Sequence, residues 1–244
     1  GSFSVDSGSF NQTGGTVTLG GDLIVGWNSS PTFTLSGGSL TTTGNIRHQD
    51  AGTAMQTISG SATATAATVY GNSGGTATDS LTVNLNTGGT LVANRLYENA
   101  TSVAGGGSHS LNVNFNGGTL KLNNASGNLI DLPTGANAAN ASVNVTVKSG
   151  GATIDTGTLN ANVLTALVHD STLGSTPDGG LTKLGSGTLT LSGVNTYTGA
   201  TAVNAGTLLV NSPGSLASGS AVTVGSSAIL GGGGTISGAV TVNA

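Results

Sequence analysis

The chain has 244 residues, of which 43 are glycine, none is cysteine and only 6% are charged, and its formal net charge is −4. The sequence contains no lysine or arginine cluster, so it offers no source of electrostatic attraction to nucleic acid or anionic lipid. The lack of cysteine excludes disulfides and thiolate metal sites, and no apolar run is long enough for a transmembrane segment.

Apolar residues make up 36% of the chain and recur at every second position within short runs. Threonine, valine and leucine dominate these runs, and such residues suit a pleated, half-buried surface. This pattern favours a folded, β-rich chain over a disordered low-complexity segment.

From the N-terminus onward, short alternating strands adjoin steps of two small residues, most often Gly-Gly. The steps are Gly14-Gly15, Gly37-Gly38, Gly88-Gly89, Gly117-Gly118, Gly150-Gly151, Ser186-Gly187, Ala205-Gly206 and Gly233-Gly234. Strands are expected at Phe33–Leu35, Leu81–Leu85, Leu111–Phe115, Thr119–Leu122, Val143–Val147 and Ala221–Val224. Glycine permits positive φ, so each step lets the chain turn a corner without forming a hairpin.

Short strands, tight corners and a repeat of about 20 to 30 residues predict an all-β fold, a single-stranded right-handed parallel β-helix (β-solenoid) of roughly 10–11 turns. Each turn would bury its valine and leucine side chains on the turns above and below. A β-sandwich is the rival fold, but the repeat lies in the sequence itself. We expect one continuous domain over residues 1–244, with degenerate turns in residues 1–178 and the most regular repeat in residues 179–244.

Three intervals interrupt the cadence. Residues 94–107 are predicted to leave the coil as an excursion, and residues 131–141 to form a loop at Pro133 and Gly135. The interval Leu159–Leu173 has a helix-like apolar spacing and fits two strands equally well.

Within residues 179–210 the cadence becomes a specific pattern. Its residues are Lys183, Gly185, Gly187, Thr188, Leu189 and Leu191, then Asn195, Tyr197, Gly199 and Thr201, then Gly206, Thr207 and Leu208. The pattern resembles the autotransporter-associated β-strand repeat, also called the passenger-associated transport repeat. The resemblance implies a β-helix passenger, secreted or displayed on the surface of a Gram-negative-type bacterium. It also implies that the repeat aids export and folding rather than catalysis.

Two polar clusters are candidates for chemistry. Arg47, His48 and Asp50 place a cation, a base and an acid within four residues, although a polar corner loop is the favoured interpretation. His169-Asp170, with Asp178 and Lys183 nearby, is a weak candidate for a metal pair, because adjacent strand residues point to opposite faces. A turn that starts at Asp170 is the simpler interpretation.

Aromatic side chains can stack on sugar rings, and Trp27 and Tyr97 are the candidates in this chain. A role in packing is the alternative for both. The residues proposed for ligand or partner contact are Trp27, Arg47, His48, Asp50, Arg95 and Tyr97. His109 stands alone and is expected at a solvated strand entrance. No catalytic, cofactor or metal site is expected.

The sequence therefore supports two classes of function. The first is an extracellular, non-enzymatic stalk, adhesin scaffold or filament subunit. Its uncapped terminal turns would self-associate or continue into further β-helix turns. The second is a β-helix that binds or degrades a polysaccharide, which requires acids and aromatic residues in one groove. A surface glycan is the ligand expected in that case.

Overall fold

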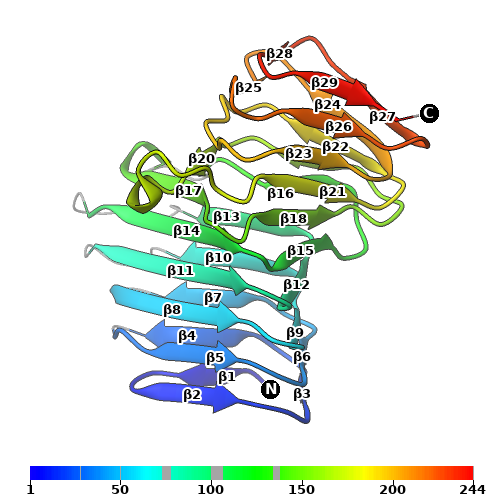
Figure 1. The fold of residues 1–244 in the computed structure, drawn as a ribbon. Coiled ribbons are helices and arrows are strands. Elements are labelled where there is room, and N and C mark those ends of the chain that lie inside the picture. Colours follow the sequence, from blue (N-terminus) through cyan, green and yellow to red (C-terminus); the bar gives the residue numbers. More distant parts are fainter. Residues whose placement is uncertain (28, 50, 73–77, 100–106, 134–137, 244) are drawn as a thin grey trace.

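The computed structural model describes residues 1–27, 29–49, 51–72, 78–99, 107–133 and 138–243. Within these ranges the chain forms short strands and two 3-10 turns, η1 (Ala138–Asn140) and η2 (Ser171–Leu173), and no α-helix. The strands stack like rungs from the N-terminus at one end to the C-terminus at the other (Figure 1).

Three sheets form the three sides of the coil, and all pairing between their strands is parallel. Sheet A contains β1 (Phe3–Val5), β4 (Leu23–Trp27), β7 (Ile46–Gln49), β10 (Thr68–Asn72), β13 (Arg95–Asn99), β16 (Gly127–Ile130), β19 (Ala161–Val163), β22 (Thr188–Leu191), β24 (Gly206–Val210) and β27 (Ala228–Gly231). Sheet B contains β2 (Ser9–Gln12), β5 (Thr32–Leu35), β8 (Gly52–Ile58), β11 (Asp79–Asn86), β14 (His109–Asn116), β17 (Ala141–Val147) and β20 (Leu167–His169). Sheet C contains β3 (Thr16–Leu19), β6 (Ser39–Thr42), β9 (Thr63–Thr65), β12 (Thr90–Ala93), β15 (Thr119–Leu122), β18 (Ala152–Asp155), β21 (Leu181–Leu184), β23 (Thr201–Val203), β26 (Val222–Val224) and β29 (Val240–Val242).

The Gly-Gly steps in the first part of the chain form the corner between sheets B and C. Gly38 has a φ of 75°, and a Cβ atom there would lie 2.2 Å from the carbonyl oxygen of Gly15 in the turn below. Only glycine fits this corner, because the conformation is left-handed and the next turn approaches too closely for a side chain. The first five steps of the cadence thus mark one corner that recurs in successive turns, whereas Ser186-Gly187 and Ala205-Gly206 lie at the corner between sheets C and A.

The core runs along the axis of the coil as stacks of inward side chains. On sheet C the inward position is apolar in nine of the ten described strands and passes through Leu40, Leu91, Leu120 and Ile154 in adjacent or near-adjacent turns. Each of these four side chains is fully buried. Strand alternation places every second residue inside, so an apolar stack forms without long apolar segments.

The structure confirms the predicted parallel β-helix. Sheets A and C each contain ten strands in the described residues, which agrees with the expected number of turns, and each regular turn has three sides. Leu159–Leu173 forms the strands β19 and β20 and the turn η2, so the two-strand interpretation of this interval is correct.

The predicted excursion at residues 94–107 is wrong for residues 95–99. These residues form β13, which pairs with β10 over its whole length and therefore belongs to the wall of the coil. Residues 100–106 lie outside the described residues. The concentration of Arg95, Tyr97 and Glu98 suggests a loop in the sequence, but two of these side chains point outward and Glu98 points into the core.

Regular pairing in sheet B stops at β20, whereas sheets A and C continue. Beyond it, the third side carries the short pair β25 (Ser215–Leu216) and β28 (Thr235–Ile236). The turns also become shorter, because fewer residues separate Leu189 from its partner Leu208 than separate Leu96 from its partner Ile130. The end of regular sheet B pairing and the shorter turns coincide with the specific pattern at residues 179–210.

Candidate functional site

Lys183 is the charged member of the repeat pattern, and its side chain lies inside the coil. It lies on β21 in the inward position that apolar residues occupy in the other sheet C strands, and it is fully buried. Its Nζ donates to the carbonyl oxygens of Gly185 at 2.8 Å, Leu184 at 3.0 Å and Ala205 at 3.0 Å, and lies 3.2 Å from Thr156 Oγ1. Burial lowers the pKa of Lys183 to about 8, against the opposing effect of the Asp155 charge. Lys183 therefore ties three successive turns together.

Asn195 replaces a strand where the regular pairing of sheet B stops. Its Oδ1 accepts the backbone N–H of Leu167 in β20 at 2.9 Å, and its Nδ2 donates to the carbonyl of Ser215 in β25 at 2.9 Å. The side chain is buried and also donates to the carbonyl of Gly193 at 2.8 Å. One amide thus satisfies backbone groups in the turns on either side, as a strand would.

Tyr197 fills the interior of the shortened turns. It is fully buried, and its hydroxyl lies 2.7 Å from Thr201 Oγ1, which lies 2.7 Å from Ser220 Oγ. Burial raises the pKa of Tyr197 to about 12. The chain of three hydroxyl groups satisfies the polar tip of a large side chain in an otherwise dry core.

Asp178 is only a neighbour of a weak metal pair in the sequence, but in the structure it organises the corner before β21. Its carboxylate accepts the backbone N–H groups of Gly180, Thr198 and Gly199 at 2.8–2.9 Å, and His169 Nδ1 at 2.7 Å. Burial opposes ionisation of this carboxyl, but the hydrogen bonds outweigh burial and lower its pKa. The sequence does not predict this role, because two of the backbone donors, Thr198 and Gly199, lie in the next turn of the coil.

The other pattern residues set corners and strands. A Cβ atom at Gly187 would lie 1.7 Å from the carbonyl oxygen of Leu159, and one at Gly199 would lie 2.3 Å from that of Asp178. The remaining members lie at corners with positive φ (Gly185, Gly206) or in strands β22 (Thr188, Leu189, Leu191), β23 (Thr201) and β24 (Thr207, Leu208). All thirteen residues therefore have a structural place in the corners, strands or interior of the coil.

The residues proposed for ligand contact lie partly together on the outer face of sheet A. Ile24, Arg47, Tyr70 and Tyr97 occupy one register position on β4, β7, β10 and β13. Sequence reasoning missed Tyr70, which the register of the coil brings beside Tyr97. Trp27 is 49% exposed and pairs with Gln49 at the end of the same strands.

The charged and aromatic side chains of this face mainly contact other protein side chains. Arg47 bonds to Asp22 at 2.7 Å, and Arg95 bonds to Asp131 through Nε at 2.9 Å. Arg95 covers one face of the Tyr97 ring at 3.9 Å, and the Tyr70 ring packs against Tyr97 with the centroids 5.3 Å apart. Tyr97 therefore offers little open ring surface to a sugar.

The proton-transfer cluster at Arg47, His48 and Asp50 is not assembled as proposed. Arg47 and His48 lie on β7 rather than in a corner loop, so their side chains point to opposite faces. His48 is fully buried and donates from Nδ1 to the Val25 carbonyl at 2.8 Å, whereas Asp50 lies outside the described residues. Sequence reasoning also misplaced His109, which is buried rather than solvated.

A column of buried polar side chains occupies the interior between sheets A and B. His109 Nδ1 donates to Asp79 Oδ1 at 2.7 Å, and both are almost fully buried. Glu98 on β13 is fully buried and pairs with Gly71 on β10, the neighbouring strand of sheet A. Burial, reinforced by the Asp79 charge, raises the pKa of Glu98 to about 8. The sequence contains a signal for this column, because Asp79 is in phase with the buried residues Leu81 and Val83.

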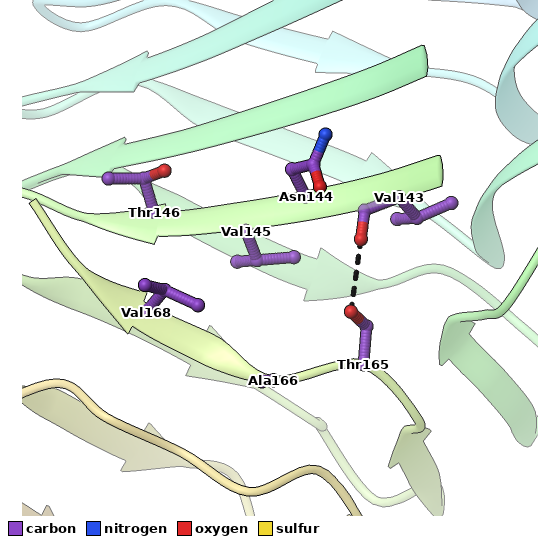
Figure 2. A pocket seen from close by; sticks show the side chains of 7 residues that line it. All are labelled: Val143, Asn144, Val145, Thr146, Thr165, Ala166 and Val168. Atoms are coloured by element: carbon purple, nitrogen blue, oxygen red, sulfur yellow. Dashed lines mark hydrogen bonds between the residues drawn. The ribbon is translucent and has the colours of Figure 1, made fainter. Parts of the chain in front are cut away.

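A hollow of about 350 Å³ lies on the outside of sheet B, where β20 pairs with only the second half of β17 (Figure 2). Thr165 Oγ1 donates to the Val143 carbonyl at 3.0 Å across this gap. The hollow is lined by Val143, Asn144, Val145, Thr146, Thr165, Ala166 and Val168. None of these seven side chains titrates, so the hollow holds no acid or base for catalysis.

Two further absences hold for the ranges given above. No three histidine or acidic side chains converge there as a metal site, and no helix is long and apolar enough to cross a membrane. His169 pairs with Asp178 and not with Asp170, whose carboxylate instead accepts the N–H of Thr172 at the start of η2. The turn expected at Asp170 is therefore present.

The fold and the buried polar contacts define a parallel β-helix whose distinctive residues stabilise its own turns. Residues 181–210 match the family model described as Passenger-associated-transport-repeat, so this stretch is a member of that repeat family. The family is a structural repeat of passenger proteins rather than an enzyme family, and it implies a secreted or surface location. No curated protein and no solved structure matches the chain.

Proposed function

We propose that the chain is a structural β-helical segment of an autotransporter-type passenger and serves as a stalk or scaffold at the surface of a Gram-negative-type bacterium. One observation carries the proposal: the repeat continues the register of the coil before it. β21 pairs with β18, and β22 pairs with β19, so the repeat and the degenerate turns form one stack. The buried side chains of the repeat contact neighbouring turns.

The repeat acts in this proposal as the brace that lets the coil fold after export. The supporting contacts are those of Asn195, which joins β20 to β25, and of Tyr197, which fills the shortened turns. Both side chains act where the third side of the coil loses regular strands. Loss of the Asn195 side chain would therefore leave backbone groups of adjacent turns unpaired, and loss of the Tyr197 ring would leave a cavity in the interior.

A surface-display assay tests the proposal. The chain is expressed in a Gram-negative host between a signal sequence and an outer-membrane translocator, and protease-resistant protein at the surface is measured. Asn195→Ala and Tyr197→Ala are expected to reduce it strongly, whereas Trp27→Ala, on the exposed face of sheet A, is expected to leave it unchanged. Equal display of all three variants would contradict a bracing role for the repeat.

We also propose that the exposed strand β29 associates with a second copy of the chain. Support comes from β29, where Val240 and Val242 are 47% and 70% exposed. Exposed valine side chains on a strand edge favour another strand. Sedimentation of the chain and of Val242→Asp tests this proposal: concentration-dependent assembly that is lost in the variant supports it, and a monomer at every concentration overturns it.

Carbohydrate binding is the alternative function, and the observation in its favour is exposed Trp27, which pairs with Gln49, the acceptor of a hydrogen bond from Arg47. A glycan array probed with the chain and with Trp27→Ala tests it. Binding that Trp27→Ala removes would support the alternative, and the absence of binding would eliminate it.

A further inference from the structure

The outer face of sheet C carries hydroxyl side chains in register along the coil. One rank, which we call the first rank, has a hydroxyl at nine of its ten positions: Thr16, Ser39, Thr63, Thr90, Thr119, Thr153, Thr182, Thr223 and Thr241, with Ala202 as the exception. Farther along the same strands, a second rank contains Thr18, Thr41 and Thr65, and its position on β12 is occupied by Val92.

The ranks survive large changes in turn length. Thr16 pairs with Ser39 and Thr119 pairs with Thr153, and the second pair encloses a much longer stretch of chain than the first. Extra residues are therefore accommodated elsewhere in the turn, and the hydroxyl positions on sheet C keep their register. The strands β3, β6, β9 and β12 lie one above another along one side of the coil (Figure 1).

The other two outer faces do not have this regularity. On sheet A the equivalent ranks contain Arg47, Tyr70 and Tyr97. Sheet B has one shorter hydroxyl rank, Thr53, Ser80, Ser110 and Ser142, but the ranks beside it contain Met55, Asn84 and Asn112. A general preference of threonine for strands would act on all three sides alike. The long hydroxyl rank with a second hydroxyl rank beside it is thus a property of sheet C.

The spacing of the first rank suits water. Paired strands place equivalent residues about 4.8 Å apart, and a hydrogen-bonded water lies about 2.8 Å from each hydroxyl oxygen. A water that bridges two such hydroxyls would then see them at an angle of roughly 118°, near the tetrahedral value. Threonine also holds its hydroxyl in few rotamers, because it is β-branched. Ser39 differs, since its Oγ donates directly to Thr16 Oγ1 at 3.2 Å.

The charge of the face also matches a neutral hydrogen-bonding lattice. The two ranks are uncharged across β3, β6, β9 and β12, and charges enter only with Lys121 on β15 and Asp155 on β18. Each hydroxyl both donates and accepts, as water does. No aromatic side chain lies in the ranks, so a sugar ring would find no surface on which to stack.

We propose that the outer face of sheet C, over β3, β6, β9 and β12, orders water in a repeating layer and binds the surface of ice. Only a repeating, neutral surface can meet many equivalent hydroxyls at once. Among such surfaces, ice is favoured over a crystalline polysaccharide because the ranks contain no aromatic side chain to stack on a sugar ring. This binding activity is independent of the proposed role as a stalk or scaffold.

Ice-affinity partition and measurement of ice-crystal growth test the proposal. The chain is expected to concentrate in a slowly grown ice fraction and to restrain crystal growth, relative to a globular reference protein. Thr41→Tyr, in the exposed second rank, is expected to abolish the enrichment because the ring holds the face away from the lattice. The matched control Thr82→Tyr, on the outer face of sheet B, is expected to keep it.

A second variant, Thr41→Val, keeps the β-branched shape and removes only the hydroxyl, so it remains informative if the tyrosine variant does not fold. A partial loss of enrichment is expected, with an unchanged thermal unfolding curve. Exclusion of the wild-type chain from ice, or equal loss in Thr82→Tyr, overturns the proposal. Retention on insoluble cellulose or chitin through Thr41, without any effect on ice, also overturns it and assigns the face to a polysaccharide.

Discussion

Glu98 gives the sharpest test of how the interior of this coil is built. Its carboxyl group is fully buried, and its Oε2 would lie 2.1 Å from a Cβ atom at Gly71, so glycine in the turn below makes room for it. Neither carboxyl oxygen has a hydrogen-bond partner among the described residues. Burial is therefore the main cause that raises the pKa of Glu98 to about 8, and the Asp79 charge adds to it.

The magnitude follows from the change in proton affinity. A pKa that moves from 4.5 in the unfolded chain to about 8 in the fold corresponds to roughly 5 kcal/mol as an upper figure, at about 1.36 kcal/mol per tenfold change. The folded state holds the proton more tightly than the unfolded state. The contribution of this group to stability is therefore greatest below pH 4.5, falls as the pH rises toward 8, and changes little above that value.

Glu98→Gln replaces the acid by a neutral group of the same shape. We expect the variant to match the wild-type free energy of unfolding near pH 4.5 and to exceed it by several kcal/mol at pH 8.5. Denaturant unfolding at both pH values, followed by circular dichroism, measures the difference. Asp6→Asn, at an exposed acid, is the control and is expected to show no such difference.

If Glu98→Gln is no more stable than the wild type at pH 8.5, the carboxyl is not held neutral by burial and the reasoning fails. A gain of equal size at pH 4.5 would also contradict it. Such a gain would show that packing, rather than the proton, is responsible.

Three further outcomes follow from the repeat. Lys183→Met is expected to lower the free energy of unfolding by about 2 to 5 kcal/mol, because buried carbonyls in neighbouring turns lose a charged donor, whereas Lys121→Met, 47% exposed, is expected to have little effect in the same denaturant titration. Gly187→Ala is expected to cost about 1 to 3 kcal/mol or to prevent folding, because of the clash with the turn below, and Gly233→Ala, with open space around it, is the control in thermal unfolding. Tyr197→Phe removes only the hydroxyl and is expected to cost about 1 kcal/mol; a melting temperature equal to wild type would contradict the buried hydroxyl chain.

The sequence was sufficient to predict the β-helical coil, because the two signals that indicate it are local. Gly-Gly steps report corners, and alternating apolar residues report strands with one dry face. The same alternation also contained the buried polar column, since His109 is in phase with Leu111 and Val113. A polar residue at a strand entrance is usually solvated, and this expectation conceals the column in the sequence.

Contacts between turns were beyond the sequence, because they depend on which residue lies one turn away. That separation along the chain is short between Leu189 and Leu208 and much longer between Thr119 and Thr153. No fixed offset therefore predicts that Tyr70 packs on Tyr97, or that Lys183 reaches the carbonyl of Ala205.

The sequence by itself thus determined that this chain coils, and that residues 181–210 carry its most specific repeat pattern. Only the tertiary structure decided what each face presents to solvent. Hydrogen bonding between turns fixes the register regardless of loop length, and this register gathers arginine and tyrosine on sheet A and aligns hydroxyl groups on sheet C.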